Sequence, residues 1–393
     1  MDYWTAVGEV YNVTLSFTFF LLAFLMFYIG RRGYKSGNRS GGVSTIICGI
    51  CFFIFGYYNM IVRFFVYPYN GFMVWWIGII LLINGVFFKI IRRESKKIRM
   101  ESDNQDINSE KKSMIRRYIE RMTLENPYKA TISYKMELIR KSFHLLGFFL
   151  AISYFGFFIF YPLTLIISDS VIQFITDIGP VYELLWGDIA LFPFVKGPNP
   201  PQSHLYNGIN ISITYLTMMA LIGALILAII SDLIRIIWSP EYSLFNFLSS
   251  SILRNKEINA IGPHIYLITG MIFTYMLYMV GLIHILAFFT GALIACISDA
   301  AAALIGRKYG KHKVIVRSKD TKSMEGFLAG MIVAYIVGII LIGPIYAIIG
   351  VVIFFITDYY PIYIADNVLN PLLIPIGIQL FILLLGLPVG WFP

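Results

Sequence analysis

Long apolar runs alternate with short polar segments along the whole chain. Each run is continuous and has roughly the 20 residues that a helix needs to cross a bilayer. The runs cover residues 13–30, 43–67, 72–91, 143–167, 208–234, 263–280, 283–304, 326–342, 344–357 and 371–388. Because helices satisfy the backbone of such continuous runs in lipid, the pattern predicts an all-α polytopic membrane protein with about ten transmembrane helices.

The charge pattern orients these helices. The chain has 393 residues, of which 58% are hydrophobic and 13% charged, and its net charge is +9. A basic chain can bind nucleic acid, but here the basic residues lie between the runs, where the positive-inside rule accounts for them. When the helices alternate, the basic segments 31–39, 92–141 and 307–322 share one side, and residues 168–206 are an expected acidic loop on the outer side. We therefore expect a multi-pass integral membrane protein with cytoplasmic basic segments, both termini outside and no nucleic-acid partner.

Residues 92–135 differ from the runs in composition, because they are rich in Lys, Arg, Glu, Asp, Asn and Ser. This composition predicts a solvated, partly helical cytosolic linker, and attraction to anionic lipid headgroups is the alternative. Together with the three runs before it, the linker defines a predicted accessory module over 1–135. The remaining residues, 136–393, are the predicted catalytic transmembrane domain of about seven helices.

The segment "SDAAAALIGRKYGKHKVIVRSKDTKSMEG" concentrates polar chemistry at the edge of an apolar run. Asp299, Ala302, Ala303 and Gly306 have the spacing i, i+3, i+4 and i+7, so they share one face of a helix. Small residues allow another helix to approach closely, and they equally leave room for a ligand beside the carboxylate. An ionisable residue in a membrane span favours a functional role.

Basic residues and glycines follow Asp299, and then the segment "TKSMEG" opens another helix. Glycine lets backbone amides turn toward an anion, and the free amides and dipole of a helix N-terminus attract one. The pattern predicts a phosphate-binding segment formed by Gly306, Arg307, Gly310, Lys311, Lys322, Ser323, Glu325 and Gly326. The spacing of "GRKYGKH" is not that of a Walker A loop, and no protein kinase signature occurs.

A second polar face enters the membrane in "MELIRKSFH", where Glu137, Arg140, Lys141 and His144 have the same helical spacing. Ion pairing of the acid with the bases explains part of this face. His144 lies one turn deeper, where a polar group requires a partner or a ligand. The other candidates at the same helix ends are Asp232, Arg254 and Asp366.

Five segments occur in a fixed order from about residue 137 onward: "ELIRKSFH", "LRNKEINAIGPHIYLITG", "SDAAAALIGRKYGKHK", "KSMEG" and "DNVLNP". On these segments the chain resembles the membrane kinase family of dolichol kinase, phytol kinase and the CTP-dependent diacylglycerol kinase. The first 130 or so residues are outside the resemblance. The resemblance implies transfer of a phosphoryl group from a nucleoside triphosphate, typically CTP, to the hydroxyl of a membrane lipid alcohol, with a divalent metal such as Mg²⁺. Ser298 and Met324 depart from the common residues of the family, and neither touches the chemistry.

These observations give an expected site that faces the cytoplasm. Asp299 holds the metal, with Asp232 or Asp366, while cations hold the phosphates. The expected catalytic residues are Asp299, Lys322, His144 and Arg140, and Lys141 and Arg254 join the phosphate-binding set. The expected acceptor is an isoprenoid alcohol such as dolichol or polyprenol, or a diacylglycerol-like lipid.

Two other functions stay open. Phosphatidate cytidylyltransferases carry a similar K-[ST]-x-E-G segment, so a CTP-dependent enzyme that makes a CDP-activated lipid is the first alternative. Their carboxy-terminal acidic and His-Gly-Gly block is absent from this chain. A transporter is the second alternative, although transporters bind their substrates near the bilayer midplane and the polar segments here are at helix ends.

Overall fold

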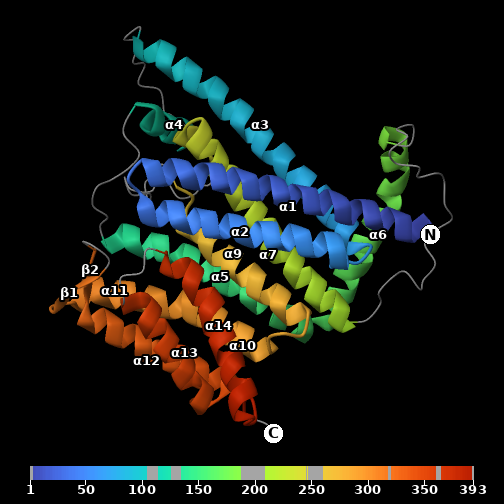
Figure 1. The fold of residues 1–393 in the computed structure, drawn as a ribbon. Helices are drawn as coiled ribbons and strands as arrows, with labels where there is room; N and C mark the ends of the chain where they lie inside the picture. Colours follow the sequence, from blue (N-terminus) through green and yellow to red (C-terminus); the bar gives the residue numbers. More distant parts are fainter. Residues whose placement is uncertain are drawn as a thin grey trace.

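The computed structural model describes residues 3–103, 114–124, 134–186, 209–244, 246, 260–316, 320–359 and 364–391. Helices dominate these residues, which confirms the predicted all-α class (Figure 1). The α-helices are α1 (Tyr3–Lys35), α2 (Arg39–Val62), α3 (Tyr69–Asp103), α4 (Met114–Leu124), α5 (Tyr134–Ile159), α6 (Tyr161–Trp186), α7 (Ile209–Ile237), α9 (Pro263–Met279), α10 (Ile285–Leu293), α11 (Asp299–Tyr309), α12 (Met324–Ile342), α13 (Pro344–Tyr359) and α14 (Asp366–Leu385). The short elements are a 3-10 turn η2 (Pro240–Tyr242), a π-helical turn η4 (Ile294–Ser298), and the strands β1 (Lys313–Val316) and β2 (Asp320–Ser323).

Seven helical segments among the described residues are long and apolar enough to cross a membrane, which confirms a polytopic protein. They are Gly8–Lys35, Arg39–Val62, Tyr69–Glu101, Ser212–Ile237, Ile285–Tyr309, Met324–Ile342 and Asp366–Leu385. A further candidate, Ile152–Ile159 with Tyr161–Ile175, is bent by 102° and brings the number to eight at most. The expected number of ten is not confirmed, because one apolar run is bent and because two helices, α9 with 17 residues and α13 with 16, are shorter than the roughly 20 residues of a full span.

The structure corrects the expected outer loop at 168–206. Helix α6 continues through the first half of this segment and ends at Trp186. Val171 and Ile175 are buried, so one face of the continuing helix packs on the core. The expectation of a loop is therefore wrong for 168–186, where three of the acidic residues belong to α6, and residues 187–206 lie outside the described residues.

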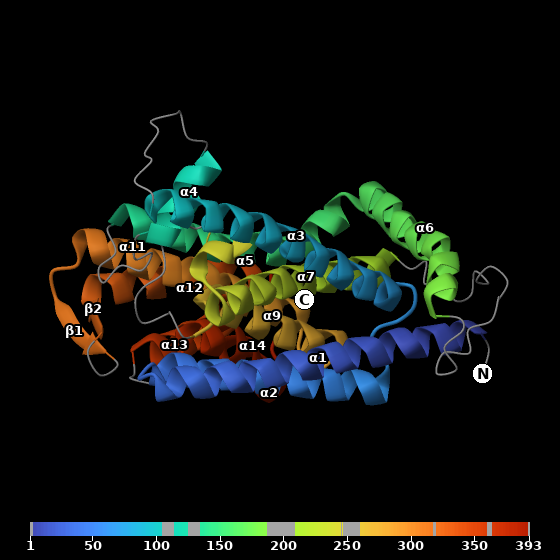
Figure 2. The ribbon, with the colours of Figure 1, turned by 90° about the horizontal axis from the view of Figure 1, so that it is seen from above.

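The helices form layers that Figures 1 and 2 show from two directions. Helices α1 and α2 form an antiparallel hairpin along one side of the molecule, and α3 and α6 lie on the opposite side (Figure 2). Helices α7 and α9 lie between these layers, and α9 contacts α2, α7 and α14. The centre is apolar: Ile229, Ile265, Met271 and Phe288 are fully buried there.

The predicted accessory module and the predicted catalytic domain share this core. Helix α2 packs on α9 and α3 packs on α7. One cluster of buried apolar side chains includes Leu15 and Phe52 from the first part and Ile226 and Ile374 from the second. The division into an accessory and a catalytic part is therefore not a division between separate cores, and it stays a prediction about function.

The β1–β2 hairpin marks one end of the bundle, which we call the polar end. The strands are antiparallel, with Lys313 opposite Ser323 and Val316 opposite Asp320. In Figures 1 and 2 this hairpin lies at the opposite end of the molecule from the N-terminus. The sequence did not predict the hairpin. It links α11 to α12 and carries Lys322, which lies two residues before α12 begins.

Candidate active site

Asp299 is the first residue of α11 and follows the π-helical turn η4 directly. π-helical turns are rare in proteins overall, but those that occur are often found at functional sites. The span Ile285–Tyr309 passes through this point, and the Asp299 side chain is only 12% exposed. A carboxylate in such a position is costly unless it has polar partners or a ligand.

Lys141 of α5 supplies a cation to Asp299. Its Nζ donates a hydrogen bond to Asp299 Oδ2, and its side chain is 6% exposed. The two residues are 158 positions apart in the sequence, so this pair depends on the packing of α5 against α11. The structure thus brings together two of the residues that the sequence predicted for the site.

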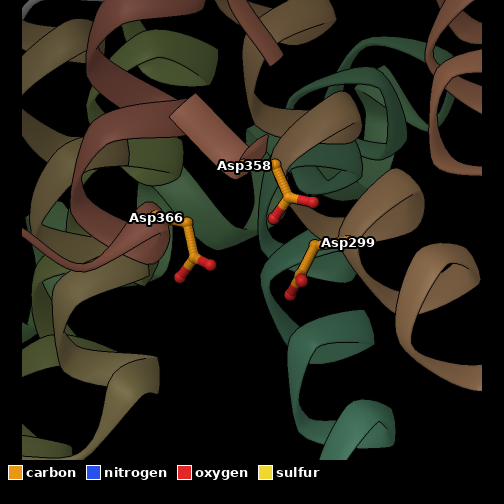
Figure 3. Close-up of side chains that lie close together, drawn as sticks. All are labelled: Asp299, Asp358 and Asp366. Carbon is orange, nitrogen blue, oxygen red and sulfur yellow. The ribbon is translucent and has the colours of Figure 1, made fainter. Parts of the chain in front are cut away.

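Asp358 and Asp366 complete a group of three carboxylates with Asp299. Asp358 lies one residue before the end of α13, and Asp366 is the first residue of α14. One oxygen from each of the three side chains lies within 4.8 Å of the others. Figure 3 shows the three carboxylates gathered around a shared space. We call these three residues the acidic cluster.

Lys322 of β2 is the second cation of the site. Its Nζ contacts Asp358 Oδ1 and lies 3.7 Å from Asp366 Oδ2. Burial disfavours the charged ammonium, but the carboxylates of Asp358 and Asp366 together raise the pKa of Lys322 above its ordinary value. Lys322 is therefore a cation at neutral pH.

The acidic cluster fits a divalent cation. The cluster has three carboxyl groups against the two basic side chains of Lys141 and Lys322, so the acids outnumber the bases by one. Carboxylate oxygens are the hard ligands that Mg²⁺ prefers. Each lysine side chain is long and flexible, so it can exchange its carboxylate partner for another anion.

Glu137 organises two of the predicted phosphate-binding cations. Its carboxylate accepts hydrogen bonds from Arg140 Nε (3.1 Å) and Nη2 (2.6 Å) and lies 3.1 Å from Arg307 Nη2. Burial raises the pKa of Glu137, but Arg140 and Arg307 lower it more, so the net shift is downward. The pairing links α5 to α11 and fixes both guanidinium groups at the polar end.

The small residues of α11 pack against α12. A Cβ at Gly306 would lie 2.7 Å from Ser323 Oγ, and a Cβ at Gly326 would lie 2.6 Å from the Ala302 carbonyl oxygen. The small residues of this helix face predicted either a close helix approach or room for a ligand. The structure shows the close approach. A role of Gly306, Gly310 and Gly326 in phosphate binding stays a prediction.

The start of α12 uses its own polar residues locally. Ser323 is the N-cap, and its Oγ accepts a hydrogen bond from the Gly326 amide (3.1 Å). The Glu325 carboxylate accepts from the His312 amide (3.2 Å) and contacts His312 Nδ1 (2.8 Å). Lys311 is exposed beside this pair. These contacts order the hairpin, and the predicted contacts of Ser323, Glu325 and Lys311 with a nucleotide are not tested by them.

Of the two residues that we expected as alternative partners of Asp299 at the metal, Asp366 belongs to the acidic cluster and Asp232 does not. Both oxygens of Asp232 accept from Arg235 at 3.0 Å, and Oδ2 also accepts from the Gly262 amide at 2.6 Å. Arg235 in turn donates to the Ala260 carbonyl at 2.7 Å. This buried pair anchors the residues that lead into α9, so its charge is used within the fold.

Helix α2 also reaches the site. Ser44 is fully buried, and its Oγ accepts a hydrogen bond of 2.8 Å from the Ala365 amide, one residue before Asp366. Thr45 contacts the Tyr266 hydroxyl at 3.0 Å, which ties the same turn of α2 to α9. The N-terminal helices therefore hold the backbone that carries one member of the acidic cluster.

Two predicted residues cannot be placed. His144 belongs to α5, but its side chain lies outside the described residues, and Arg254 lies outside them entirely. The sequence analysis missed two other residues of the site, Asp358 and Ser44. Asp358 could have been identified, because an acid within an apolar segment is a functional candidate. Ser44 could not, because a single serine in an apolar run is common.

Comparison with known proteins supports part of the resemblance. No family model and no solved structure matches the chain. A region of 121 residues is 35% identical to CTP-dependent diacylglycerol kinase 1 of Saccharomyces cerevisiae. The match covers 30% of this chain and 38% of the yeast protein. The chain is thus similar to part of a kinase of the expected kind, and this comparison does not test the dolichol and phytol kinases.

Proposed function

We propose that this protein is a membrane lipid kinase that transfers the γ-phosphoryl group of CTP to the hydroxyl of a lipid alcohol. The observation that carries the proposal is the convergence of Asp299, Asp358 and Asp366 with Lys141 and Lys322 at the polar end of the bundle. Phosphoryl transfer requires mainly positioned substrates and neutralised phosphate charge. The similarity to a CTP-dependent kinase supports the reaction class and the donor.

The acidic cluster is the proposed site of the divalent metal. Asp299, Asp358 and Asp366 would hold Mg²⁺, and the metal would neutralise charge on the triphosphate and orient it. The residues present fit this role, because the three side chains offer oxygen ligands from three helices within reach of one another.

Cations of the chain would bind the phosphates. Lys141 and Lys322 already lie against the cluster, so each is within reach of a phosphate beside the metal. Arg140 and Arg307 are held by Glu137, and their planar guanidinium groups can bind phosphate oxygens in pairs. In the transfer, the lipid oxygen forms a bond to the γ-phosphorus while the bond to the bridging β–γ oxygen breaks. The products are a lipid phosphomonoester, CDP and the proton of the hydroxyl.

Diacylglycerol is the first acceptor to test, because the related yeast protein is named for it. An isoprenoid alcohol such as dolichol or polyprenol is the second, since it presents the same hydroxyl on an apolar tail. We also propose that the polar end faces the cytoplasm, where CTP is available, because the basic segments of the chain share this side.

The decisive experiment is a product assay on the purified full-length protein in lipid nanodiscs. Diacylglycerol, dolichol and phytol are each supplied with γ-labelled CTP or ATP, and label is traced into lipid phosphate. The proposal requires labelled lipid from the wild-type protein and loss of at least a hundredfold in rate for Asp299→Ala and Lys322→Ala. Release of pyrophosphate with a CDP-lipid product would identify the cytidylyltransferase instead. Wild-type rates in both variants would end the assignment.

A further inference from the structure

A group of exposed basic side chains lies on α3, away from the acidic cluster. An open groove of about 370 Å³ follows one face of this helix. It is lined by Phe88, Lys89, Arg92, Arg93 and Lys96. All four cations are exposed or partly exposed, and among the described residues none of the four forms an ion pair. This arrangement differs from the nearby Lys97, which is paired with Glu94 at 2.9 Å.

The groove lies at the level of the membrane interface. A helix that begins at Tyr69 crosses about 30 Å of hydrocarbon in about 20 residues, which brings the boundary near Lys89. Aromatic contacts mark the same level, because Phe88 packs edge-on against Trp238 (5.4 Å between centroids) and Tyr242 (5.1 Å). Trp238 is 59% exposed. Exposed tryptophan beside cations is typical of the headgroup region.

The face of α3 above the groove suits an acyl chain. Leu82 and Val86 are 67% and 52% exposed and lie on the same side as Lys89 and Arg93, with the spacing i, i+4, i+7 and i+11. A Cβ at Gly85 would meet no atom within 4 Å, so the surface is open there. An apolar face thus continues directly into a group of cations.

We propose that this groove binds an anionic phospholipid, with the phosphate between Arg92, Arg93 and Lys96 and one acyl chain along Leu82 and Val86. Four cations that pair with no carboxylate in the described part of the chain complement a negative headgroup, and the apolar continuation of the groove selects a lipid over a free phosphate. Each cation close to an anionic membrane surface contributes about a fivefold factor in binding. Removing three of them therefore weakens binding on the order of 10²-fold.

The test measures lipid binding and needs no catalytic turnover, so its result is independent of the proposed kinase activity. Native mass spectrometry of the detergent-solubilised full-length protein counts bound phosphatidylserine against a background of phosphatidylcholine. The test variant is Arg92→Gln, Arg93→Gln and Lys96→Gln together.

The matched control removes three cations from the same kind of position at the end of α1: Arg31→Gln, Arg32→Gln and Lys35→Gln. We expect the groove variant to lose a bound phosphatidylserine and the control to keep it. Equal loss in both variants, or no loss in the groove variant, would overturn the proposal. Competition by glycerophosphoserine, which has no acyl chains, would show a soluble-anion site and would also overturn it. Thermal melting of both variants confirms that each is folded before binding is compared.

Discussion

Replacing Asp358 by asparagine tests the member of the acidic cluster that the sequence did not reveal. The substitution keeps the shape of the side chain and an oxygen that can accept from Lys322, but it removes one negative charge. Asp358 is 2% exposed, whereas Lys322 is 32% exposed and Asp366 17% exposed. The effective dielectric constant at the site is thus intermediate between that of the protein interior and that of water.

The structure sets the size of the expected effect. Two unit charges about 4 Å apart interact by about 4 kcal/mol at an effective dielectric constant of 20 and by about 1 kcal/mol in water. An intermediate value of about 2 to 3 kcal/mol corresponds to a roughly hundredfold weaker affinity for a metal ion. The fold itself should be little affected, because the change removes repulsion from Asp299 and Asp366 as well as attraction to Lys322.

The assay is a titration of lipid phosphorylation with Mg²⁺ in nanodiscs, paired with a thermal melt of the metal-free protein. We expect the Mg²⁺ concentration for half-maximal rate to rise about a hundredfold and the melting midpoint to change by a few degrees at most. Asp169→Asn, which removes an exposed acid of α6, is the control and should leave both unchanged. An unaltered Mg²⁺ dependence in Asp358→Asn would refute the assignment of this residue to the metal.

Three further predictions follow from contacts of the fold. Ser44→Ala should raise the Mg²⁺ concentration for half-maximal rate about fivefold, with little change in kcat at saturating metal. The reason is that one hydrogen bond worth about 1 kcal/mol no longer positions Asp366. An unchanged Mg²⁺ titration curve would contradict this prediction. Gly310→Ala should lower the free energy of unfolding by about 1 to 3 kcal/mol, because the new Cβ would lie 2.2 Å from a backbone oxygen. Gly78→Ala is the control and should not lower it, because a Cβ there would meet no atom within 4 Å. Denaturant titration of both variants compares the two effects. Because the pKa of Glu137 is lowered in the folded protein, its carboxylate stabilises the fold above pH 4.5, and this contribution is lost as the pH falls through the native pKa. Thermal melts across this pH range should therefore show a weaker acid dependence for Glu137→Gln than for the wild-type protein. Identical melting profiles would contradict this prediction.

The sequence predicted those parts of the site that depend on where apolar runs end. Asp299, Lys141, Lys322 and Asp366 each stand near such an end, so strict alternation of the helices is enough to expect them on one side. Their mutual contacts in the structure agree with this reasoning.

Features set by packing between distant helices could not be predicted in this way. Asp358 joins the cluster because α13 packs beside η4 and α14. Asp232 instead pairs with Arg235, which lies one turn away on the same helix. The bend between α5 and α6 is different, because it falls at residue 160, two positions before Pro162. A proline is a sequence signal for a helix break, and our sequence analysis did not use it. Hydrophobic periodicity gives the elements and their order, whereas these details depend on which neighbours each helix face meets.

The turn η4 controls the rotational phase of everything that follows it. An α-helix turns by about 100° per residue, and a π turn holds an additional residue without breaking the helical path. Phe288 and Phe289, before the turn, therefore stay in the core while Asp299, after it, faces the acids of α13 and α14. Deleting one residue from 294–298 would leave the apolar character of the span intact, yet it would swing Asp299 by about 100° away from the other two acids. A change of length in one turn, with no change of chemical groups, would dismantle the site.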